Sequence, residues 1–314
     1  ALKSMNEPGF RAQQVWDWLW QKRVTRFEDM RNLPLMLRQK LEQAFVINAV
    51  HIHETQSSAD GTLKCAMRLH DQYVVESVLI PQGKRMTACI SSQVGCSLTC
   101  SFCATGKLKR MRNLQADEIY DQVMLVNETA LNTYQQKLSN IVFMGMGEPL
   151  LNYNQVKEAI TKLCAPEGMG LSPQRITVST AGVHKMIRTL ADDRLNVHLA
   201  LSLHAASDEK RNQVMPINET NSLAMLKEAL VYFYTTNGRR PTLEYVMLNG
   251  FNDSLEDARR LLTWSRGLKT KVNLIEYNPV ADTGFTPSSN NRMHAFAAFL
   301  NEHGLVCTIR KSRG

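Results

Sequence analysis

The sequence predicts an α/β protein whose main part is an open, partial (β/α)6 barrel. From Thr87 onward, short apolar strand-like segments alternate with amphipathic helical segments, a pattern typical of parallel strands joined by right-handed crossovers. Six such units are too few for a closed eight-fold barrel. Upstream the pattern changes, so we expect a small N-terminal helical domain at residues 1–50, a β-hairpin extension at 51–85 and the barrel at 86–314.

Composition limits the function classes before any motif is considered. The chain has 314 residues, 44% of them hydrophobic, enough for one large core with a small appendage. No apolar run approaches the roughly 20 residues that span a bilayer, and no secretory signal opens the sequence. Clustered cysteines favour a reducing compartment, so we expect a cytoplasmic protein without a membrane partner. Lys and Arg exceed Asp and Glu by 37 − 29 = 8, which favours a polyanion such as RNA or DNA.

The N-terminal segment predicts two basic helices. Residues 9–22 place apolar side chains at helical spacing, and Pro34 is a favourable first-turn residue for a helix that runs to Phe45. Basic side chains on this segment are Lys22, Arg23, Arg26, Arg31, Arg38 and Lys40. RNA contact and a solvated packing face are equally open interpretations of these charges.

The next segment predicts a hairpin. After the turn pair Asp60-Gly61, residues 63–69 alternate between apolar and polar side chains, as a half-buried strand does. Residues 73–81 return as a second strand. Pro81 and Gly83 then suggest a boundary before the barrel.

The predicted barrel strands and helices follow in order. Strands are expected at Ala88–Ser92, Ile141–Met144, Ile176–Thr180, Val197–Leu203, Leu243–Leu248 and Val272–Tyr277, with a final strand at Leu305–Arg310. Helices are expected at Ala116–Asn127, Gln155–Cys164, Val183–Ala191, Leu223–Tyr234, Leu255–Trp264 and Asn291–His303. Ligands bind at the carboxyl ends of the strands in such folds, so the loops after the strands should form the site.

The chemically unusual residues follow these strand ends. The loops are the cysteine-rich segment after the first strand, GMGEP at 145–149, STAG at 179–182, SLH at 202–204 and Asn278-Pro279. One such loop would be ordinary turn chemistry. Five loops on one rim predict a pocket.

The cysteine-rich segment 89–103 contains four of the seven cysteines. Cys96, Cys100 and Cys103 have the spacing C-x3-C-x2-C, which predicts a shared metal centre. Four cysteines would complete the coordination of zinc or of an iron–sulfur cluster, whereas three leave one position open for chemistry. The alternative, a set of buried reduced thiols, explains three cysteines at this spacing poorly.

This cysteine loop resembles that of radical S-adenosylmethionine (SAM) enzymes, and the fold class is then a partial radical-SAM barrel. The resemblance implies one [4Fe–4S] cluster held by Cys96, Cys100 and Cys103, whose fourth iron binds SAM and cleaves it to a deoxyadenosyl radical. The SAM contacts that the resemblance implies are Gly147, Glu148, Ser179, Ser202, Leu203, His204 and Asn278. Taken alone, His204 would be a structural histidine and Glu148 a solvated turn carboxylate.

A closer resemblance covers nearly the whole chain. VESVLIP, CISSQVGC, GMGEPLLN, VSTAGV, LSLHA, EYVML and IRKSRG resemble the RlmN/Cfr family of radical-SAM RNA adenine methyltransferases. This implies methylation of carbon 2 of an adenosine in 23S rRNA and in tRNA, through a methylcysteine and a transient protein–RNA crosslink. It also implies an electron donor such as flavodoxin or ferredoxin, and we expect a monomer.

The same resemblance implies two catalytic residues in this chain. Glu76 matches the general base that removes the ring proton, which must leave when an sp² carbon is methylated. Cys89 matches the cysteine that resolves the crosslink by forming a disulfide. By their residue types alone, Glu76 would be an exposed strand carboxylate and Cys89 a buried strand thiol.

The methyl-carrying cysteine of the family lies shortly after the segment that resembles RKSRG, and this sequence stops at Gly314. We therefore expect that cysteine to be absent from this chain. Cys307 lies within an alternating apolar pattern, so we expect it in a strand core. A protein without the tail cysteine should cleave SAM and fail to methylate RNA.

Several alternatives remain open. The rival within the family methylates carbon 8 of adenosine, and nothing in the cysteine motif separates the two. A non-catalytic RNA-binding protein with structural zinc and a radical-SAM enzyme acting on a peptide or small molecule are the other candidates. RNA contacts are expected at the basic helices near Lys22–Arg38 and at Lys107, Lys109, Arg110 and Arg112, for which a solvated loop is an equal alternative.

Overall fold

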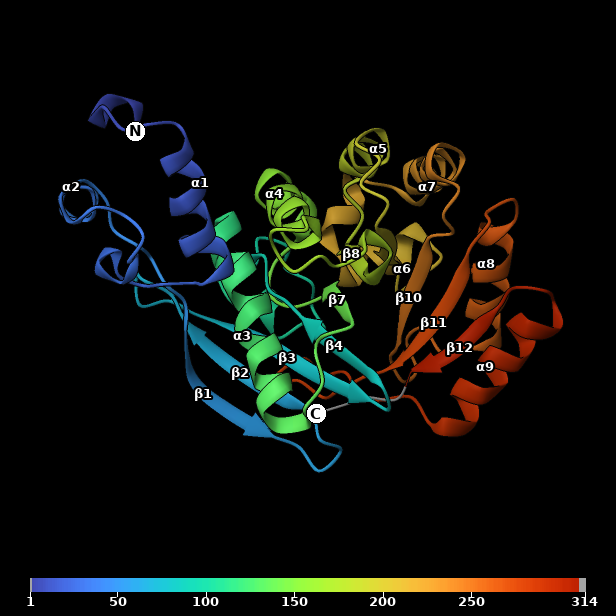
Figure 1. Cartoon of the computed structure of the whole chain (residues 1–314). Coiled ribbons are helices and arrows are strands. Elements are labelled where there is room, and N and C mark those ends of the chain that lie inside the picture. Colours follow the sequence, from blue (N-terminus) through green and yellow to red (C-terminus); the bar gives the residue numbers. More distant parts are fainter. Residues whose placement is uncertain (1, 311–314) are drawn as a thin grey trace.

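The computed structural model describes residues 2–310 and has an α/β fold built on one ten-stranded sheet (Figure 1). The strand order is β1-β2-β3-β4-β7-β8-β9-β10-β11-β12. Neighbouring strands are antiparallel from β1 to β4 and parallel from β4 to β12. The predicted hairpin and the predicted barrel therefore belong to one continuous sheet, and β4 is the strand at which its direction changes.

The N-terminal helices form as predicted, with one change. Helix α1 (Phe10–Trp16) continues as a π-helical turn (Asp17–Gln21), and α2 spans Leu35–Ala44. Their own small core is formed by Phe27, Met30, Leu33, Leu37 and Leu41. In Figure 1 these helices lie to one side of the sheet, next to α3 and the antiparallel strands.

The antiparallel part of the sheet contains one more strand than predicted. Its strands are β1 (His51–Ser57), β2 (Leu63–Arg68), β3 (Val74–Gln82) and β4 (Arg85–Cys89). All seven residues of β1 are exposed, so the strand lacks the alternation that reveals a half-buried strand. Pro81 is part of β3, and Gly83 turns the chain into β4, so the sheet continues through the boundary suggested there.

The parallel strands and their helices confirm the partial (β/α)6 barrel. The strands are β7 (Asn140–Phe143), β8 (Ile176–Thr180), β9 (His198–Ser202), β10 (Thr242–Met247), β11 (Lys271–Glu276) and β12 (Cys307–Arg310). The helices are α3 (Ala116–Tyr134), α4 (Tyr153–Cys164), α5 (His184–Asp192), α6 (Asp208–Val214), α7 (Leu223–Asn237), α8 (Leu255–Ser265) and α9 (Asn290–Glu302). Only α6 was not predicted. Within residues 2–310 no helix combines the length and the apolar character needed to cross a bilayer.

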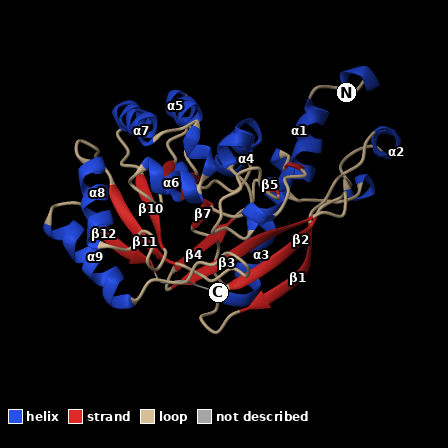
Figure 2. Ribbon diagram, turned by 180° about the vertical axis from the view of Figure 1, so that it is seen from behind, coloured by secondary structure: helices blue, strands red, loops and turns tan. Residues whose placement is uncertain are grey.

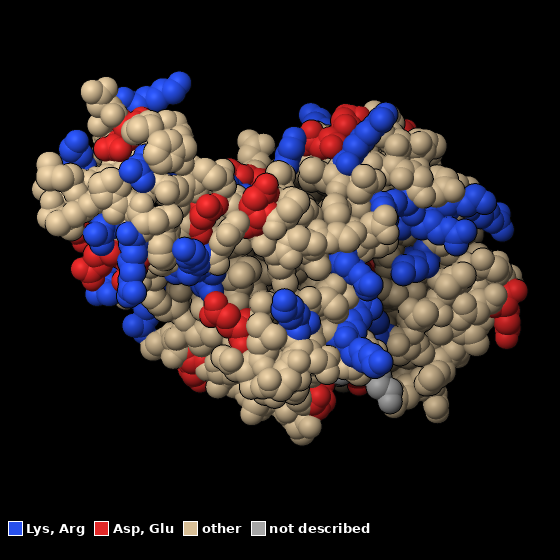
Figure 3. Space-filling view, viewed as in Figure 1, with Lys and Arg blue, Asp and Glu red and all other residues tan. Residues whose placement is uncertain are grey.

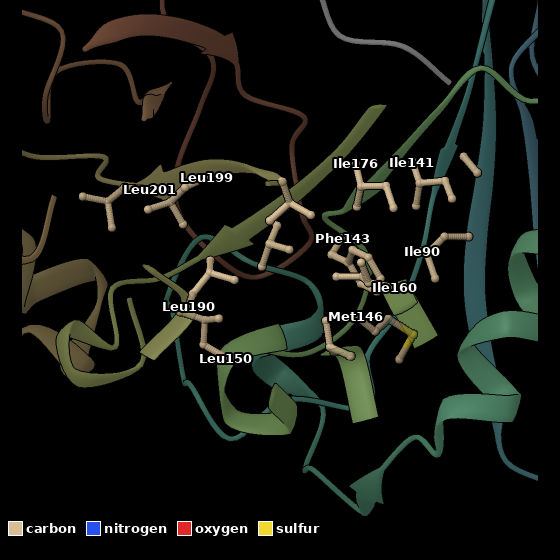
Figure 4. Packing of buried hydrophobic residues seen from close by; sticks show 14 of the residues in the cluster. Ile90, Ile141, Phe143, Met146, Leu150, Ile160, Ile176, Leu190, Leu199 and Leu201 are labelled. Atoms are coloured by element: carbon tan, nitrogen blue, oxygen red, sulfur yellow. The ribbon is translucent and has the colours of Figure 1, made fainter. Parts of the chain in front are cut away.

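The main core lies between the sheet and its covering helices. Apolar side chains from neighbouring strands meet there, including Ile141, Phe143, Ile176, Leu199 and Leu201 (Figure 4). Each is buried, and together they remove a large apolar surface from water, which is the main driving force for folding. This packing fixes the strands and thereby the loops at their carboxyl ends.

The N-terminal helices are joined to the barrel through α3. The Trp20 ring stands edge-on against Tyr120, with the ring centroids 5.1 Å apart, and the Tyr120 hydroxyl donates to the Trp20 carbonyl at 2.9 Å. Arg23 lies next to two acidic groups of α3, Asp121 at 3.4 Å and Glu128. These contacts orient the N-terminal helices relative to the barrel.

Candidate functional site

The cysteine loop follows the short strand β5 (Gln93–Val94) and is closed by its partner β6 (Arg112–Asn113). Gly95 has φ +73°, and a Cβ there would lie 2.2 Å from the Lys109 carbonyl oxygen. A Cβ on Gly106 would lie 2.6 Å from the Cys100 carbonyl oxygen. Glycine is therefore required at both positions for the loop to fold back on itself.

The three cysteines of this loop lie close to one another. The Cys103 amide donates to the Cys100 carbonyl at 3.2 Å, and the Leu98 amide lies 3.4 Å from the Cys96 sulfur, to which it donates. Burial, together with the neighbouring Cys103 and Cys96, raises the pKa of the Cys100 thiol to about 12. Bringing thiolates together is unfavourable without a cation, so this set of donors suits a metal cluster.

The cysteines suit a cluster as a set of donors, but they are not arranged as a finished metal site. Among residues 2–310, no group of three His, Cys, Asp or Glu side chains has a geometry ready to hold an ion. All three cysteine residues are partly exposed. Three donors with one open coordination position match a cluster that binds a further ligand.

The exit of the cysteine loop is anchored by a buried ion pair. Arg112 donates from Nη1 and Nη2 to the two carboxylate oxygens of Glu118, both at 2.7 Å, and from Nε to Asp71 at 2.5 Å. The Glu118 side chain is only 2% exposed. Arg112, expected as an RNA contact, is thus occupied by two carboxylates and joins the loop to α3 and the β2–β3 turn.

The loop after β7 approaches the cysteine loop closely because of its glycines. A Cβ on Gly145 would lie 2.8 Å from the Ile90 backbone, and Gly147 has φ +92° with its missing Cβ 2.4 Å from the Gln93 side chain. The Gln93 side-chain oxygen accepts from the Glu148 amide at 2.9 Å. Backbone from two loops is thereby packed together at one end of the sheet.

Glu148 is buried and joins two rim loops. One carboxylate oxygen accepts from the Leu150 amide at 3.0 Å, and the other accepts from the Ala181 amide at 2.7 Å. Burial raises the pKa of Glu148 to about 7, and these backbone donors act in the opposite direction. The residue is therefore not the solvated turn carboxylate considered as the alternative.

The ends of β8 and β9 bring two predicted SAM contacts together. The hydroxyls of Ser179 and Ser202 lie 3.5 Å apart. The next residues, Leu203 and His204, are buried. The His204 Nδ1 accepts from the Val246 amide at 3.0 Å, and burial lowers the pKa of its ring to about 3. His204 is therefore a neutral ring whose Nε2 carries the proton.

Asn278 lies in the exposed loop after β11. The residue before it, Tyr277, is buried and donates from its hydroxyl to the Phe102 carbonyl at 3.3 Å. Phe102 lies between Cys100 and Cys103, so this loop borders the cysteine loop. The structure thus joins the rim loops that carry the predicted SAM contacts to the cysteine loop through hydrogen bonds and ring contacts.

Glu76 and Cys89 lie on one face of the antiparallel part of the sheet. Cys89 is the partner of Val78 in the β3–β4 register, and Glu76 is two residues from Val78, so all three share a face. Ser77 points the other way, because its hydroxyl donates to Gln122 of α3 at 3.0 Å.

The Glu76 carboxylate is 48% exposed and pairs with Lys64 at 2.7 Å. Burial raises the pKa of Cys89 to about 11.

The expected disulfide would join Cys89 to the tail cysteine of the family, and the described residues contain no disulfide. All seven cysteines lie within the described residues, and all are free thiols. Cys307 belongs to the main core of the sheet and helices, as expected for a strand-core residue, whereas Cys89 lies on the face opposite α3. The sheet therefore separates the two thiols. Of the IRKSRG motif, KSRG lies outside the described residues.

Three site residues were not singled out in the sequence. Gln93 also donates to Asn113 at 2.8 Å, which ties β5 to β6, and Asn152 donates to the Ser92 and Leu114 carbonyls, both at 2.8 Å. Arg211 of α6 is fully buried beneath the rim. The capping signal Ser207-Asp208-Glu209 and the following Pro216 could have revealed α6, but nothing in the sequence marks Arg211 as buried.

The fold and the cysteine loop define a radical SAM protein. The model of the Radical SAM superfamily matches residues 90–262, which include the cysteine loop and the parallel strands up to β10. A crystal structure of a radical SAM methyltransferase from Sphaerobacter thermophilus is similar over 100% of this chain and 92% of its own, with a TM-score of 0.93 and 37% identity. The chain therefore has the radical SAM fold.

The chain belongs to the RlmN family. The model of the ribosomal RNA large subunit methyltransferase N-terminal domain matches residues 2–47. A probable dual-specificity RNA methyltransferase RlmN from Christiangramia forsetii is 51% identical over 98% of this chain and 88% of its own length. The dual-specificity RNA methyltransferase RlmN from Campylobacter hominis is 40% identical over 100% and 91%.

Proposed function

We propose that this protein is a radical-SAM methyltransferase that methylates carbon 2 of an adenosine in 23S rRNA and in tRNA. The observation that carries the proposal is the cysteine loop with three thiols at the rim of a barrel that belongs to the RlmN family. The name of the relatives favours carbon 2 over carbon 8. Methylation of carbon 8 is the alternative that the product assay below distinguishes.

Cys96, Cys100 and Cys103 would hold a [4Fe–4S] cluster, and SAM would occupy the position that they leave open. When bound, this pair supplies a strongly oxidising carbon radical from the SAM sulfonium. The residues proposed to hold SAM are Gly147, Glu148, Ser179, Ser202, Leu203, His204 and Asn278. Their backbone and hydroxyl groups suit an amino acid and a ribose.

Glu76 and Cys89 are the proposed catalytic residues of the chain. Methylation at a ring carbon requires loss of the ring proton, and the Glu76 carboxylate can accept it. The Lys64 ammonium lies 2.7 Å from this carboxylate and can hold it in place. Cys89 shares this face with Glu76, so we assign both to the same substrate.

We assign RNA binding to the N-terminal helical domain, residues 1–50, and to basic surfaces of the barrel, residues 86–314, with the strands of 51–85 between them. Figure 3 shows Lys and Arg gathered over the right half of the face, whereas on the left they alternate with Asp and Glu. Burial lowers the pKa of His198, and the nearby charges of Arg239, Lys271 and Arg85 lower it as well, so these three basic side chains gather around His198 at the amino ends of the strands. Such a surface suits a phosphate backbone. A target adenosine in a stem must be flipped out to react.

We also propose an electron donor, a cellular location and an oligomeric state. Reduction of the cluster requires an electron donor such as flavodoxin or ferredoxin, and we propose a cytoplasmic monomer. Sedimentation at several protein concentrations tests the last point. A concentration-independent mass near that of one chain supports it, and a dimer would contradict it.

The test is anaerobic reconstitution with iron and sulfide, followed by an assay of SAM products and RNA products together. Deoxyadenosine formation is expected, with loss of this product in Cys96→Ala and normal levels in Cys164→Ala, a cysteine on α4 outside the loop. Because the methyl-carrying cysteine is expected outside this sequence, the assay also uses a chain extended by a relative's C-terminal tail. Mass spectrometry of the RNA then distinguishes 2-methyladenosine from 8-methyladenosine. A colourless zinc protein that forms no deoxyadenosine would overturn the proposal.

A further inference from the structure

Helix α6 (Asp208–Val214), labelled in Figure 2, contacts both the cysteine loop and the rim loops of β8 and β9. The Ser101 amide, between Cys100 and Cys103, donates to the Val214 carbonyl at 3.0 Å. Cys100 and Phe102 also pack against the small cluster that contains Val214 and Met215. The C-terminal end of α6 is therefore attached to the cysteine loop.

Arg211 of the same helix is attached to the rim. Its guanidinium donates from Nη2 to the Ala181 carbonyl at 2.5 Å and the Ser202 carbonyl at 3.1 Å. It also donates from Nε to the Leu203 carbonyl at 3.0 Å and from Nη1 to the Asn218 side-chain oxygen at 2.7 Å. Three backbone carbonyls from the ends of two adjacent strands are thus held by one side chain.

Arg211 carries a buried positive charge that no carboxylate contacts within the described residues. Its exposed fraction is 0%, and no ion pair to it occurs among residues 2–310. Arg211 is connected to a carboxylate only through Asn218. The Asn218 side chain accepts from Arg211 and donates to Asp208 at 2.8 Å. A buried cation is costly unless hydrogen bonds or a nearby anion compensate it. Arg211 lies one turn of α6 before Val214, whose carbonyl accepts from the Ser101 amide of the cysteine loop, so the buried charge lies close to that loop.

We infer that Arg211 is a positioning residue that locks the β8 and β9 rim loops to the cysteine loop and places a buried positive charge next to that loop. The hydrogen bonds set the geometry of the rim, and the charge favours an electron-rich cluster. The inference rests on the proposed function only in placing the cluster and SAM at this rim.

The first experiment compares amide hydrogen exchange in the anaerobically reconstituted wild type and Arg211→Lys. Lysine keeps the charge but cannot donate to four acceptors in fixed directions. We expect faster exchange in peptides covering 98–104, 180–184 and 201–206, and SAM affinity weaker by about tenfold, as for loss of buried hydrogen bonds of order 1.4 kcal/mol. Arg259→Lys on α8, an exposed position, should change neither. Unchanged exchange in all three peptides would overturn the positioning role.

The second experiment measures the midpoint potential of the reconstituted cluster. Arg211→Met removes the charge at similar length, so reduction becomes harder and the potential shifts to a more negative value than in Arg211→Lys. The matched control Arg259→Met removes one exposed positive charge and should leave the potential near that of wild type. Equal potentials in Arg211→Met and Arg259→Met would overturn the electrostatic role.

These outcomes are separable from failure of the proposed function. If Arg211→Met does not fold, the comparison of Arg211→Lys with wild type still tests both the exchange pattern and SAM affinity. If wild type forms no cluster, the proposed function fails, whereas the exchange comparison on the unreconstituted protein still tests whether Arg211 locks the three loops together.

Discussion

The ring of Phe102 stands edge-on against the ring of His204, with centroids 4.9 Å apart and an angle of 79° between the planes. Phe102 belongs to the cysteine loop and His204 to the loop after β9, which are separated by about one third of the chain. An edge-to-face pair contributes roughly 0.5–1.5 kcal/mol beyond burial. The contact brings two parts of the site together that the sequence alone does not place side by side.

His204→Phe should destabilise the protein by about 1–3 kcal/mol. The phenyl ring can keep the contact with Phe102, but the buried Val246 amide loses the Nδ1 acceptor at 3.0 Å. Urea unfolding at pH 7.5 measures the change. His303→Phe, at an exposed position after α9, is the control and should lie within about 0.5 kcal/mol of wild type. Equal midpoints for the two variants would contradict the structural role of His204.

The same histidine should make stability depend on pH. Burial lowers the pKa of folded His204 to about 3, whereas the unfolded ring takes up a proton near pH 6.5. The unfolded state therefore binds more protons below pH 6.5, and the contribution of His204 is lost as pH falls toward 3. Relative to His204→Phe, wild type should lose stability over this range. A difference that stays constant from pH 7 to 4.5 would count against this pKa.

Glu148 should have the opposite pH dependence. Its pKa is raised from 4.5 to about 7 in the folded protein, so the folded state holds a proton that the unfolded state has lost between these values. The stability of wild type relative to Glu148→Gln should therefore fall by up to about 3 kcal/mol as pH rises from 4.5 to 7, and then level off. Thermal unfolding across this range measures it. A relative stability that rises with pH would show that the carboxylate is charged in the folded state.

The glycines of the β7 loop should tolerate no side chain. Gly145→Ala places a Cβ 2.8 Å from the Ile90 backbone, where nothing flexible can move away. We expect a loss of stability of about 2 kcal/mol or more and weaker SAM binding. The control Gly9→Ala, at a glycine that like Gly145 has no positive φ, meets no atom within 4 Å. If Gly9→Ala costs as much as Gly145→Ala, crowding is not the cause.

Removing Arg112 alone should destabilise the protein more than removing Arg112 and Glu118 together. Arg112→Met leaves the Glu118 carboxylate, which is 2% exposed, without its bidentate partner, and we expect a loss of about 2–3 kcal/mol. The double variant Arg112→Met/Glu118→Met should recover at least half of it. Chemical denaturation of the four proteins gives the coupling. Strict additivity of the two single changes would show that the pair does not anchor the loop.

The sequence by itself determined the fold class and predicted a metal cluster at the cysteine loop. Alternation of strands and helices depends on local periodicity, and the spacing of Cys96, Cys100 and Cys103 depends only on chain distance, so both can be read directly. Strand β1 was missed because both its faces are exposed, and α6 because seven residues give a weak periodic signal. The disulfide of Cys89 is not found, because its expected partner is the family's tail cysteine and not one of the described cysteines.

Only the tertiary structure decided which side chains meet at the rim. The order of strands in the sheet brings distant loops into contact. The resulting contacts are Gln93 with Glu148, Glu148 with Ala181, and Phe102 with His204. Arg211 looks in the sequence like any surface arginine of a polar helix, since DEKRNQV has no apolar stripe before Val214. Packing buries it, because α6 crosses the ends of β8 and β9, where three backbone carbonyls and Asn218 can satisfy its guanidinium.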